Sequence, residues 1–254
     1  MTETGYAGMA GAWAEGPALA YGPMAEHLLA RAPVQLRGSR ALDAGAGSGI
    51  AGAALRARGA RVVAADRELD MAVHNAAAGP AVAADVTALP FRPGTFDVVV
   101  AAFVVNHLPD PVAGLAEFRR VARPGGVLLA STFSEDRAVA KEAVDAVAAD
   151  YGFVAPAWYL DLQAFAQTVR DVPGFEDELA AAGFSRWTVT EDRIDVGLDA
   201  EGVVRYRLGM PHLHRFAAGL PADLRASLFA DAVDAVRRTG QRFAPLVIEA
   251  VATA

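Results

Sequence analysis

A glycine-rich turn beside an acidic residue is the part of this sequence whose spacing is best suited to hold a ligand. The stretch ALDAGAGSG places Gly45, Gly47 and Gly49 between a strand-like run that ends at Asp43 and a helical segment that begins near Ser48. Glycines at these positions allow a tight turn and let a ligand approach the backbone. The free N–H groups at the start of the helix suit an anionic part of that ligand. We therefore expect a ligand-binding turn here.

Two further acidic residues end the next two predicted strands. Asp66 closes the run RVVAAD about 20 residues after the glycines, where a carboxylate can accept hydrogen bonds from both hydroxyls of a ribose. Asp85 closes AVAAD beside Val86, which offers a carboxylate for an adenine amino group and an apolar side chain for the ring. Each acid could instead only cap the turn after its strand. The agreement of the three positions favours the ligand interpretation.

The elements that must position these residues alternate between strand and helix. This βαβ order implies right-handed crossovers into a parallel sheet that is covered on both faces. Further strands are predicted over 184–196 and 243–252. The strands of the alternating region are predicted at 40–43, 61–66, 81–85, 96–100 and 126–132, and its helices at 49–58, 68–77 and 110–122.

The flanking regions are predicted to be mainly helical. Punctuation by Gly16-Pro17 and Gly22-Pro23 divides the helices of the N-terminal stretch. Ser134 is expected to cap a helix over 134–150, and Pro173 to interrupt the chain before a short helix over 176–182. We expect an N-terminal helical lid (1–38), a ligand-binding core (39–133), a helical and aromatic insertion (134–183), and C-terminal strands with substrate-cap helices that complete the same domain (184–254).

Composition excludes several classes of protein. The chain has 254 residues, a net charge of −7 and no cysteine, so it forms no disulfide, thiolate zinc site or iron–sulfur cluster. The acidic balance argues against nucleic acid as a partner. No apolar run approaches the ~20 residues of a membrane span, and the N-terminus lacks the basic region of a signal peptide. We expect a cytoplasmic monomer or homodimer without a metal.

The order of the motifs resembles that of class I S-adenosylmethionine (SAM)-dependent methyltransferases. LDAGAGSG is followed by VVAAD, ADVTALPF, FDVVVAAFVVNHL and RRVARPGGVLL. The resemblance covers roughly 40–132 and is closest to the small-molecule type related to ubiquinone and menaquinone biosynthesis. It implies an α/β fold with a doubly wound, Rossmann-like sheet of seven strands. The last strand is then antiparallel, N-terminal helices precede the sheet, and a helical lid is inserted after the fifth strand.

The resemblance also implies SAM as cofactor and S-adenosylhomocysteine as product. The matching positions assign the methionine end to one group of residues, the ribose and adenine to two others, and the amino group to backbone carbonyls. Tyr21 would close over the cofactor, although this chain has Tyr-Gly-Pro where many relatives have Tyr-Asp-Arg. The methionine end would be lined by Asp43, Gly45, Ala46 and Gly47, and the ribose would be held by Asp66 with Arg67. The adenine would contact Asp85 and Val86, and the amino group would bind the backbone carbonyls of Ala101 and Ala102.

His107 is the candidate general base. It follows the fourth predicted strand, at the edge where open α/β sheets bind ligands. The alternative is that His107 only fixes the loop before Pro109. His27 and His74 fall in predicted helices and are expected to be packing or surface groups.

Two clusters are candidates for binding the substrate. Arg205, His212 and His214 lie close together in the sequence and could hold an acidic substrate through charge-assisted hydrogen bonds, or they could form a solvated helix face. Aromatic residues in the predicted lid segments could build an apolar pocket, although ordinary packing explains each singly. These are Tyr6, Trp13, Phe153, Trp158 and Tyr159.

The predicted activity is transfer of a methyl group from SAM to a small molecule, with natural-product biosynthesis as the expected setting. A SAM-binding enzyme of the same fold with non-methylating chemistry, such as cyclisation, is an open alternative. An NAD(P)-dependent oxidoreductase would use the Gly47–Gly52 match to G-x-G-x-x-G. It would also need an acid such as a Tyr/Lys pair, and the one lysine, Lys141, falls in a predicted surface helix. A non-enzymatic SAM-binding protein is the fourth hypothesis.

Overall fold

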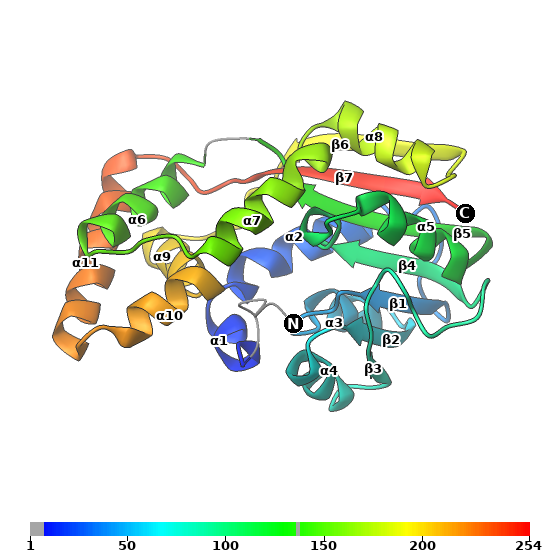
Figure 1. Cartoon of the computed structure of the whole chain (residues 1–254), viewed down its shortest axis with the longest axis horizontal. Helices are drawn as coiled ribbons and strands as arrows, with labels where there is room; N and C mark the ends of the chain where they lie inside the picture. The colour runs from blue at the N-terminus through cyan, green and yellow to red at the C-terminus, as the bar shows by residue number, and fades with distance from the viewer. Residues whose placement is uncertain (1–7, 136–137) are drawn as a thin grey trace. The chain divides into compact units, whose positions relative to one another are not determined.

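Seven strands form one mixed sheet in the order β3-β2-β1-β4-β5-β7-β6. The structure is a computed structural model that describes residues 8–135 and 138–254. Strands β1 to β5 run parallel, and β7 runs antiparallel to β5, as the opposed arrows in Figure 1 show. This confirms the predicted fold. The strands are β1 (Arg40–Ala44), β2 (Arg61–Asp66), β3 (Ala81–Ala83), β4 (Phe96–Ala102), β5 (Ala122–Phe133), β6 (Arg186–Arg193) and β7 (Leu246–Thr253).

Helices pack on both faces of the sheet. Leu28 and Leu55 pack with Val100 on one face, and Phe118 and Phe175 belong to the core on the other face. Both faces of the central strands are therefore buried, which explains their nearly continuous apolar sequence. The helices involved are α2 (Ala18–Ala30) and α3 (Ile50–Ala57) on the first face and α5 (Pro111–Val121) and α8 (Val172–Ala181) on the second.

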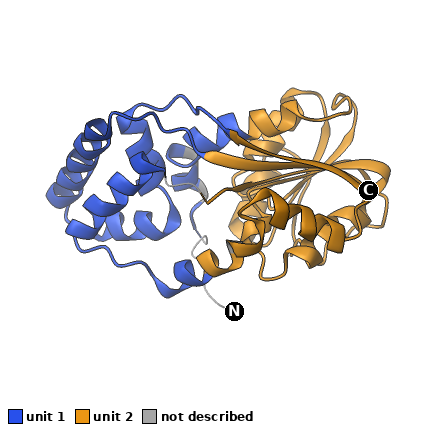
Figure 2. Ribbon diagram, turned by 90° about the horizontal axis from the view of Figure 1, so that it is seen from above, with its two compact units in different colours: residues 1–24, 136–161, 193–245 blue, residues 25–135, 162–192, 246–254 orange. Residues whose placement is uncertain are grey.

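The described chain divides into two compact units, which Figure 2 colours separately. Residues 25–135, 162–192 and 246–254 form the sheet unit. Residues 8–24, 138–161 and 193–245 form the helical unit, whose small core includes Ala148, Leu213 and Leu228. The remaining helices are α1 (Ala10–Glu15), α4 (Leu69–Ala76), α6 (Val139–Asp150), α7 (Ala157–Phe165), α9 (Ala200–Leu208), α10 (Pro211–Gly219) and α11 (Ala222–Thr239), with 3-10 turns η1 (Val105–His107) and η2 (Ala166–Val169).

Three predictions about helix ends were wrong. Pro23 lies inside α2 and does not end a helix, because packing of this helix on the sheet outweighs one lost backbone hydrogen bond. Ser134 does not cap α6, which begins at Val139; its hydroxyl donates to Glu191 instead. Pro173 does not interrupt the chain but occupies the first turn of α8, where the missing N–H is tolerated.

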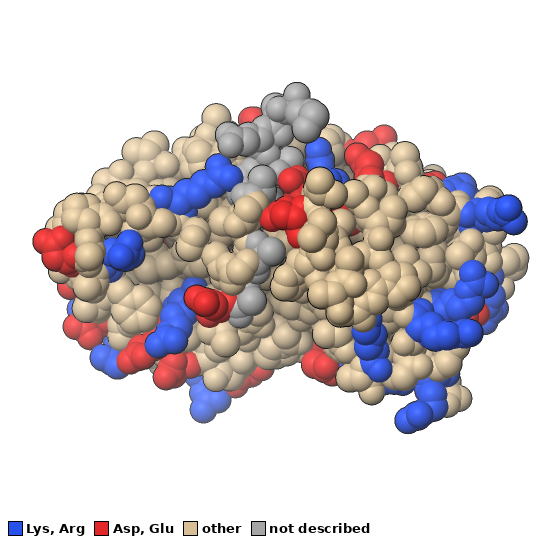
Figure 3. Space-filling model, turned by 90° about the horizontal axis from the view of Figure 1, so that it is seen from below, with Lys and Arg blue, Asp and Glu red and all other residues tan. Residues whose placement is uncertain are grey.

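The surface carries charges of both signs. Figure 3 shows acidic and basic side chains separated by larger areas of neutral residues on the face drawn. Within the described part of the chain, no helix is long and apolar enough to span a bilayer. The described residues also contain no group of three or more His, Asp or Glu side chains that could hold a metal ion.

Candidate active site

The turn between β1 and α3 has positive φ angles at three glycines, with +52° at Gly47, and it is closely packed around the other two. Gly45 and Gly49 have φ angles of +66° and +82°, a region that side chains other than hydrogen rarely adopt. A Cβ atom on Gly45 would lie 2.6 Å from Cγ2 of Val104, and one on Gly49 would lie 2.3 Å from Oδ1 of Asn75. The turn is thus closely packed between the loop after β4 and helix α4. Gly47 differs, because a Cβ atom there would meet nothing within 4 Å.

Two side chains from other elements hold this turn. The N–H of Gly47 donates to Oδ2 of Asp66 at 2.7 Å, and Nδ2 of Asn75 donates to the carbonyl oxygen of Gly47 at 2.7 Å. Asp66 also accepts a hydrogen bond from the N–H of Glu68 at 2.9 Å. Burial raises the pKa of Asp66 despite these two N–H donors. Asn75 was not predicted, because an asparagine in a helix 28 residues away gives no sequence signal of this contact.

Asp43 lies beneath the same turn. It is buried, and its Oδ2 accepts the N–H of Gly52 in the first turn of α3 at 2.7 Å. Desolvation raises the pKa of Asp43 to about 7, although the backbone bond and the charge of Arg56 act in the opposite direction. The carboxyl group therefore changes protonation state near neutral pH. A cationic ligand group close to it would favour the ionised form.

Asp85 follows β3 and forms a local turn. Its Oδ1 accepts the N–H and the hydroxyl of Thr87 at 2.9 and 2.7 Å, and these bonds lower its pKa. Val86 is buried in the core of the sheet unit. Arg67 is largely exposed, with Nε 3.9 Å from Oε1 of Glu68. The turn-capping role of Asp85 is therefore present, and its contact with adenine remains a prediction.

The end of β4 lies in register with β5. Ala101 pairs with Ala130, and Ala102 pairs with Ser131. Phe103 follows with a φ of +57°. Among the described residues it is the one non-glycine residue with a positive φ. Such strained conformations are found preferentially at functional sites. Its N–H is held by the backbone oxygen of Ser131 at 3.0 Å.

Two buried polar atoms in the loops at this edge, as well as Oγ1 of Thr132 near the end of β5, have no hydrogen-bond partner within the described part of the chain. The two loop atoms are Oγ of Ser48, just before α3, and Oδ1 of Asn106, in η1 after β4. Buried polar atoms are nearly always paired in folded proteins, so a bound ligand is a natural source of the missing partners. Sequence reasoning missed both residues, since serine and asparagine in loops are common. These atoms fit a polar cofactor in this part of the sheet unit.

His107 ends η1, directly after this edge. Burial lowers its pKa to about 4, so the imidazole is neutral at physiological pH. A neutral imidazole can accept a proton, but such a low pKa makes it a weak acceptor.

The predicted residues of the helical unit fall into two groups. Tyr159 and His212 stack with ring centroids 3.8 Å apart, and Trp158 and Phe153 contact the same imidazole. In contrast, the largely exposed Arg205 lies 3.9 Å from Glu201 on the surface of α9. His214 is partly exposed.

Trp13, Tyr21 and Tyr206 form a second aromatic set within the helical unit. The ring centroids of Trp13 and Tyr21 are 5.3 Å apart, and those of Tyr21 and Tyr206 are 6.2 Å apart. Tyr6 lies outside the described residues.

Arg207, a buried cation of the helical unit, is already paired. The guanidinium of Arg207 donates to both carboxylate oxygens of Asp145, at 2.6 and 2.9 Å. His212 is buried, and desolvation together with the charges of Arg207 and Lys141 lowers its pKa to about 2. Neither group therefore offers an unpaired positive charge to an acidic substrate.

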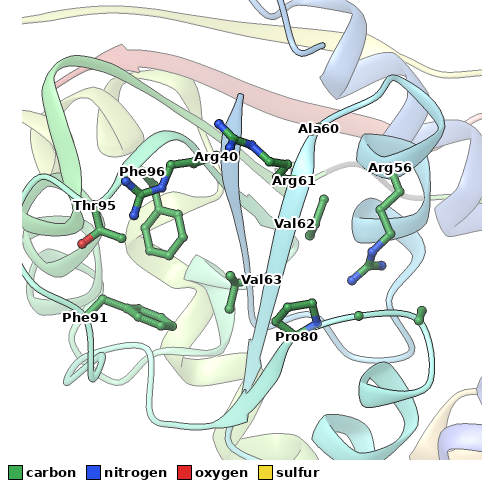
Figure 4. Close-up of a pocket in the computed structure, with 12 residues that line it drawn as sticks. Arg40, Arg56, Ala60, Arg61, Val62, Val63, Pro80, Phe91, Thr95 and Phe96 are labelled. Carbon is green, nitrogen blue, oxygen red and sulfur yellow. The ribbon is translucent and has the colours of Figure 1, made fainter. Parts of the chain in front are cut away.

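A separate groove lies at the opposite ends of the strands. It has a volume of about 560 Å³ and is lined by residues that begin β1, β2 and β4, including Arg40, Arg61 and Phe96 (Figure 4). The three predicted acids are at the carboxyl ends of their strands. This groove is therefore distinct from the candidate cofactor site.

The fold and the carboxyl edge of the sheet define a class. A sheet of this order with an antiparallel seventh strand, a glycine turn after β1 and acids after β2 and β3 is that of the class I SAM-dependent methyltransferases. Residues 42–130 match a family described as a methyltransferase domain. The segment 42–130 is therefore similar to a methyltransferase domain, and the chain has a distant similarity to demethylmenaquinone methyltransferases.

The similarity to curated relatives is confined to the core. The chain is 43% identical over 96 residues to the demethylmenaquinone methyltransferase of Mycolicibacterium vanbaalenii. That alignment covers 37% of this chain and 42% of the relative, so the chain spans less than half the length of the protein it matches.

Solved structures resemble a larger part of the chain. Phosphoethanolamine N-methyltransferase 2 of Haemonchus contortus, in complex with SAM, has a TM-score of 0.58 at 18% identity and covers 91% of this chain and 52% of its own. The cyclase SpnF has a TM-score of 0.55 at 17% identity and covers 91% of this chain and 80% of its own. At these identities the likeness shows the fold alone.

Proposed function

We propose that the protein binds SAM at the carboxyl edge of the sheet and transfers its methyl group to a small-molecule acceptor. The observation that carries the proposal is the Gly45–Gly49 turn, held by Asp66 and Asn75 within the segment that matches a methyltransferase domain. Bound SAM would supply a methyl group on a positively charged sulfur, which is already activated for displacement.

The residues of the sheet unit divide the binding of SAM between them. Asp66 would accept hydrogen bonds from the ribose hydroxyls, with Arg67 beside it, and Asp85 with Val86 would contact the adenine. Asp43, Gly45, Ala46 and Gly47 would line the methionine end. The carbonyl oxygens of Ala101 and Ala102 would accept from the amino group, and Ser48 and Asn106 would gain partners for their buried oxygens.

We assign recognition of the acceptor to the helical unit. The rings of Phe153, Trp158 and Tyr159 around His212 offer an apolar, aromatic environment. Because Arg207 is held by Asp145 and His212 is neutral, this cluster favours an uncharged acceptor over an acidic one. Trp13 and Tyr21 would contribute the second aromatic wall, whereas the exposed Arg205 and the partly exposed His214 have weaker support.

Calorimetric titration with SAM, S-adenosylhomocysteine and NADH tests the proposal. Micromolar binding of the two adenosyl ligands with no binding of NADH supports it, and the reverse pattern contradicts it. A screen of uncharged aromatic and aliphatic acceptors, natural products included, is then scored by release of S-adenosylhomocysteine. Products formed without S-adenosylhomocysteine would indicate non-methylating chemistry. SAM binding without any product would indicate a binding protein.

A further inference from the structure

Glu249 is an unusual residue for its position in the sheet. It lies in the middle of β7, in the otherwise apolar strand sequence LVIEAVAT, and its side chain has no exposed surface. Burial of a carboxylate is costly unless the group is paired and hydrogen-bonded. Two residues supply these partners: His27 of α2 through its ring, and Arg31, directly after α2, through its guanidinium. Arg31 also pairs with Asp192 at the end of β6.

The contact orients the imidazole of His27. Its Nδ1 lies 3.0 and 2.9 Å from the two carboxylate oxygens of Glu249, so the N–H on Nδ1 donates to the carboxylate. This arrangement leaves the lone pair on Nε2. The side chain of His27 is 40% exposed, so the ring is open to solvent on part of its surface. A buried carboxylate that orients a partly exposed imidazole is the arrangement that general bases use.

The register of the sheet places this pair beside the candidate active site. Glu249 is paired with Ser131 of β5, and Ser131 is paired with Ala102 at the end of β4. Neighbouring strands are separated by about 4.8 Å, so the backbone of Glu249 lies two strand spacings, about 10 Å, from Ala102. The hydroxyl of Ser131 also contacts the N–H of the strained Phe103 at 3.3 Å. The pair therefore belongs to the strand ends at which we place SAM.

We propose that His27, oriented by Glu249, is the general base of the methyl transfer, an inference that rests on the proposed function. The proton of the acceptor's O–H or N–H group moves to Nε2 while the oxygen or nitrogen bonds to the methyl carbon. The electron pair of the broken C–S bond stays on sulfur, which leaves neutral S-adenosylhomocysteine. His27 then releases its proton to solvent. Glu249 is a positioning residue, and Arg31 pairs with its carboxylate.

The groups that face His27 explain why it suits this role better than His107. Glu249 of β7 faces His27 through its carboxylate, and Arg31, which follows α2, pairs with both Glu249 and Asp192 of β6. His107 lies after β4, and burial lowers its pKa to about 4, which makes it a weak acceptor for the proton. A base must hold the proton that it accepts, and the pair formed by His27 and Glu249 provides the counter-charge.

The test compares His27→Ala, His27→Gln and Glu249→Gln with His74→Ala, a matched control on α4. We expect both His27 variants to lower kcat about 100-fold with the Kd for SAM within twofold, and to lose the acidic limb of the pH–rate profile. Added imidazole should restore activity to His27→Ala. The Glu249→Gln variant should retain an intermediate rate, and His74→Ala should match the wild type.

Several outcomes would overturn the inference. An unchanged kcat or an acidic limb retained in both His27 variants would each do so. So would an activity loss that imidazole does not rescue and that accompanies weaker SAM binding, because a structural role of His27 would produce that result. An independent measurement is the Cε1–H resonance of His27 in the wild-type protein. It should shift when SAM is added, and a resonance that does not move refutes the inference. Failure of the wild type to release S-adenosylhomocysteine would instead refute the proposed function.

Discussion

At the scale of single residues, the expected cofactor site depends on carboxylates that the fold has already engaged. Asp66 is buried and receives two backbone N–H groups, one of them from the glycine turn itself. It thus shapes the turn, and under the proposed function it would also bind the ribose. The interpretations as a cap and as a ligand group, which are alternatives in the sequence, are therefore compatible in the structure.

Replacement of Asp66 tests this double role. Asp66→Asn keeps one oxygen that can accept from Gly47 but removes the charge, and we expect at least a 10-fold loss of SAM affinity, since a hydrogen bond to a charged group contributes about 1.5–3 kcal/mol. Asp66→Ala should lose as much affinity and also reduce stability. Calorimetry and thermal unfolding give the two readouts. Unchanged affinity in both variants would exclude the ribose contact.

Asp43 predicts a specific dependence of stability on pH. Its folded pKa of about 7 lies above the ordinary value of 3.8, so between these values the folded protein binds more protons than the unfolded chain. The stabilisation is therefore present below pH 4 and is lost as the pH rises to 7. Asp43→Asn should remove this loss, which is on the order of a few kcal/mol.

Urea unfolding of the wild type and of Asp43→Asn at several pH values measures this effect. The difference between the two proteins matters, because His107 and His212 have lowered pKa values and act in the opposite direction, losing stability as the pH falls below 6.5. An equal pH dependence of the stability of wild type and variant would show that folding does not raise the pKa of Asp43.

At the scale of elements, helix starts are set by side-chain caps that the sequence shows only in part. Asp110 caps α5 through the N–H of Ala113, and Asp171 caps α8 through the N–H of Gly174. In both helices a proline follows within the first turn. The helix predicted over 110–122 agrees with α5, which begins directly after Asp110. The related Asp-Val-Pro was interpreted as a break before α8, because a proline marks either a helix start or a helix end and sequence alone does not separate the two.

The cap of α8 can be tested directly. Asp171→Ala should lower the free energy of unfolding by about 1 kcal/mol, because an N–H in the first turn loses its acceptor. Asp177→Ala is the matched control, since Asp177 is exposed in the same helix. Equal effects of the two substitutions in urea unfolding would contradict the capping role.

At the scale of the whole molecule, the two units differ in how the sequence encodes them. Each unit is assembled from three stretches of the chain, but the sheet unit contains, within its first and longest stretch, the segment that matches a methyltransferase domain. The buried pair of Arg207 and Asp145 joins two stretches of the helical unit, because these residues lie on α9 and α6. Removal of one partner of such a pair is costly, because it leaves the other charge buried and unpaired.

We expect Asp145→Ala to lower stability by about 2–3 kcal/mol, less than a fully buried pair would lose, because the side chain of Asp145 is 35% exposed. The double variant Asp145→Leu with Arg207→Met should recover much of this loss, since it leaves no buried unpaired charge. Thermal unfolding of the three proteins measures both effects. A double variant less stable than Asp145→Ala would show that the pair itself is the main stabilising contact.

The sequence by itself determined the alternating strands and helices of the parallel sheet and the glycine turn with its acids. These features are local: a strand, a turn and a helix follow one another within about 30 residues, and their apolar periodicity is visible without any long-range contact. The resemblance of residues 40–132 to methyltransferases depended on the same local motifs. For that reason the residues of the candidate SAM site, which follow one another in the sequence motifs, lie on neighbouring strands of the structure.

Only the tertiary structure decided which distant side chains meet. Asn75 reaches Gly47 across 28 residues, Tyr159 stacks on His212, and Glu249 holds His27 across 222 residues. None of these contacts leaves a periodic signal, because each depends on the packing of separate elements and on the removal of water from polar groups. Burial also decided the charge states: it made His107 and His212 neutral and raised the pKa of Asp43, which no spacing of residues in the sequence could have indicated.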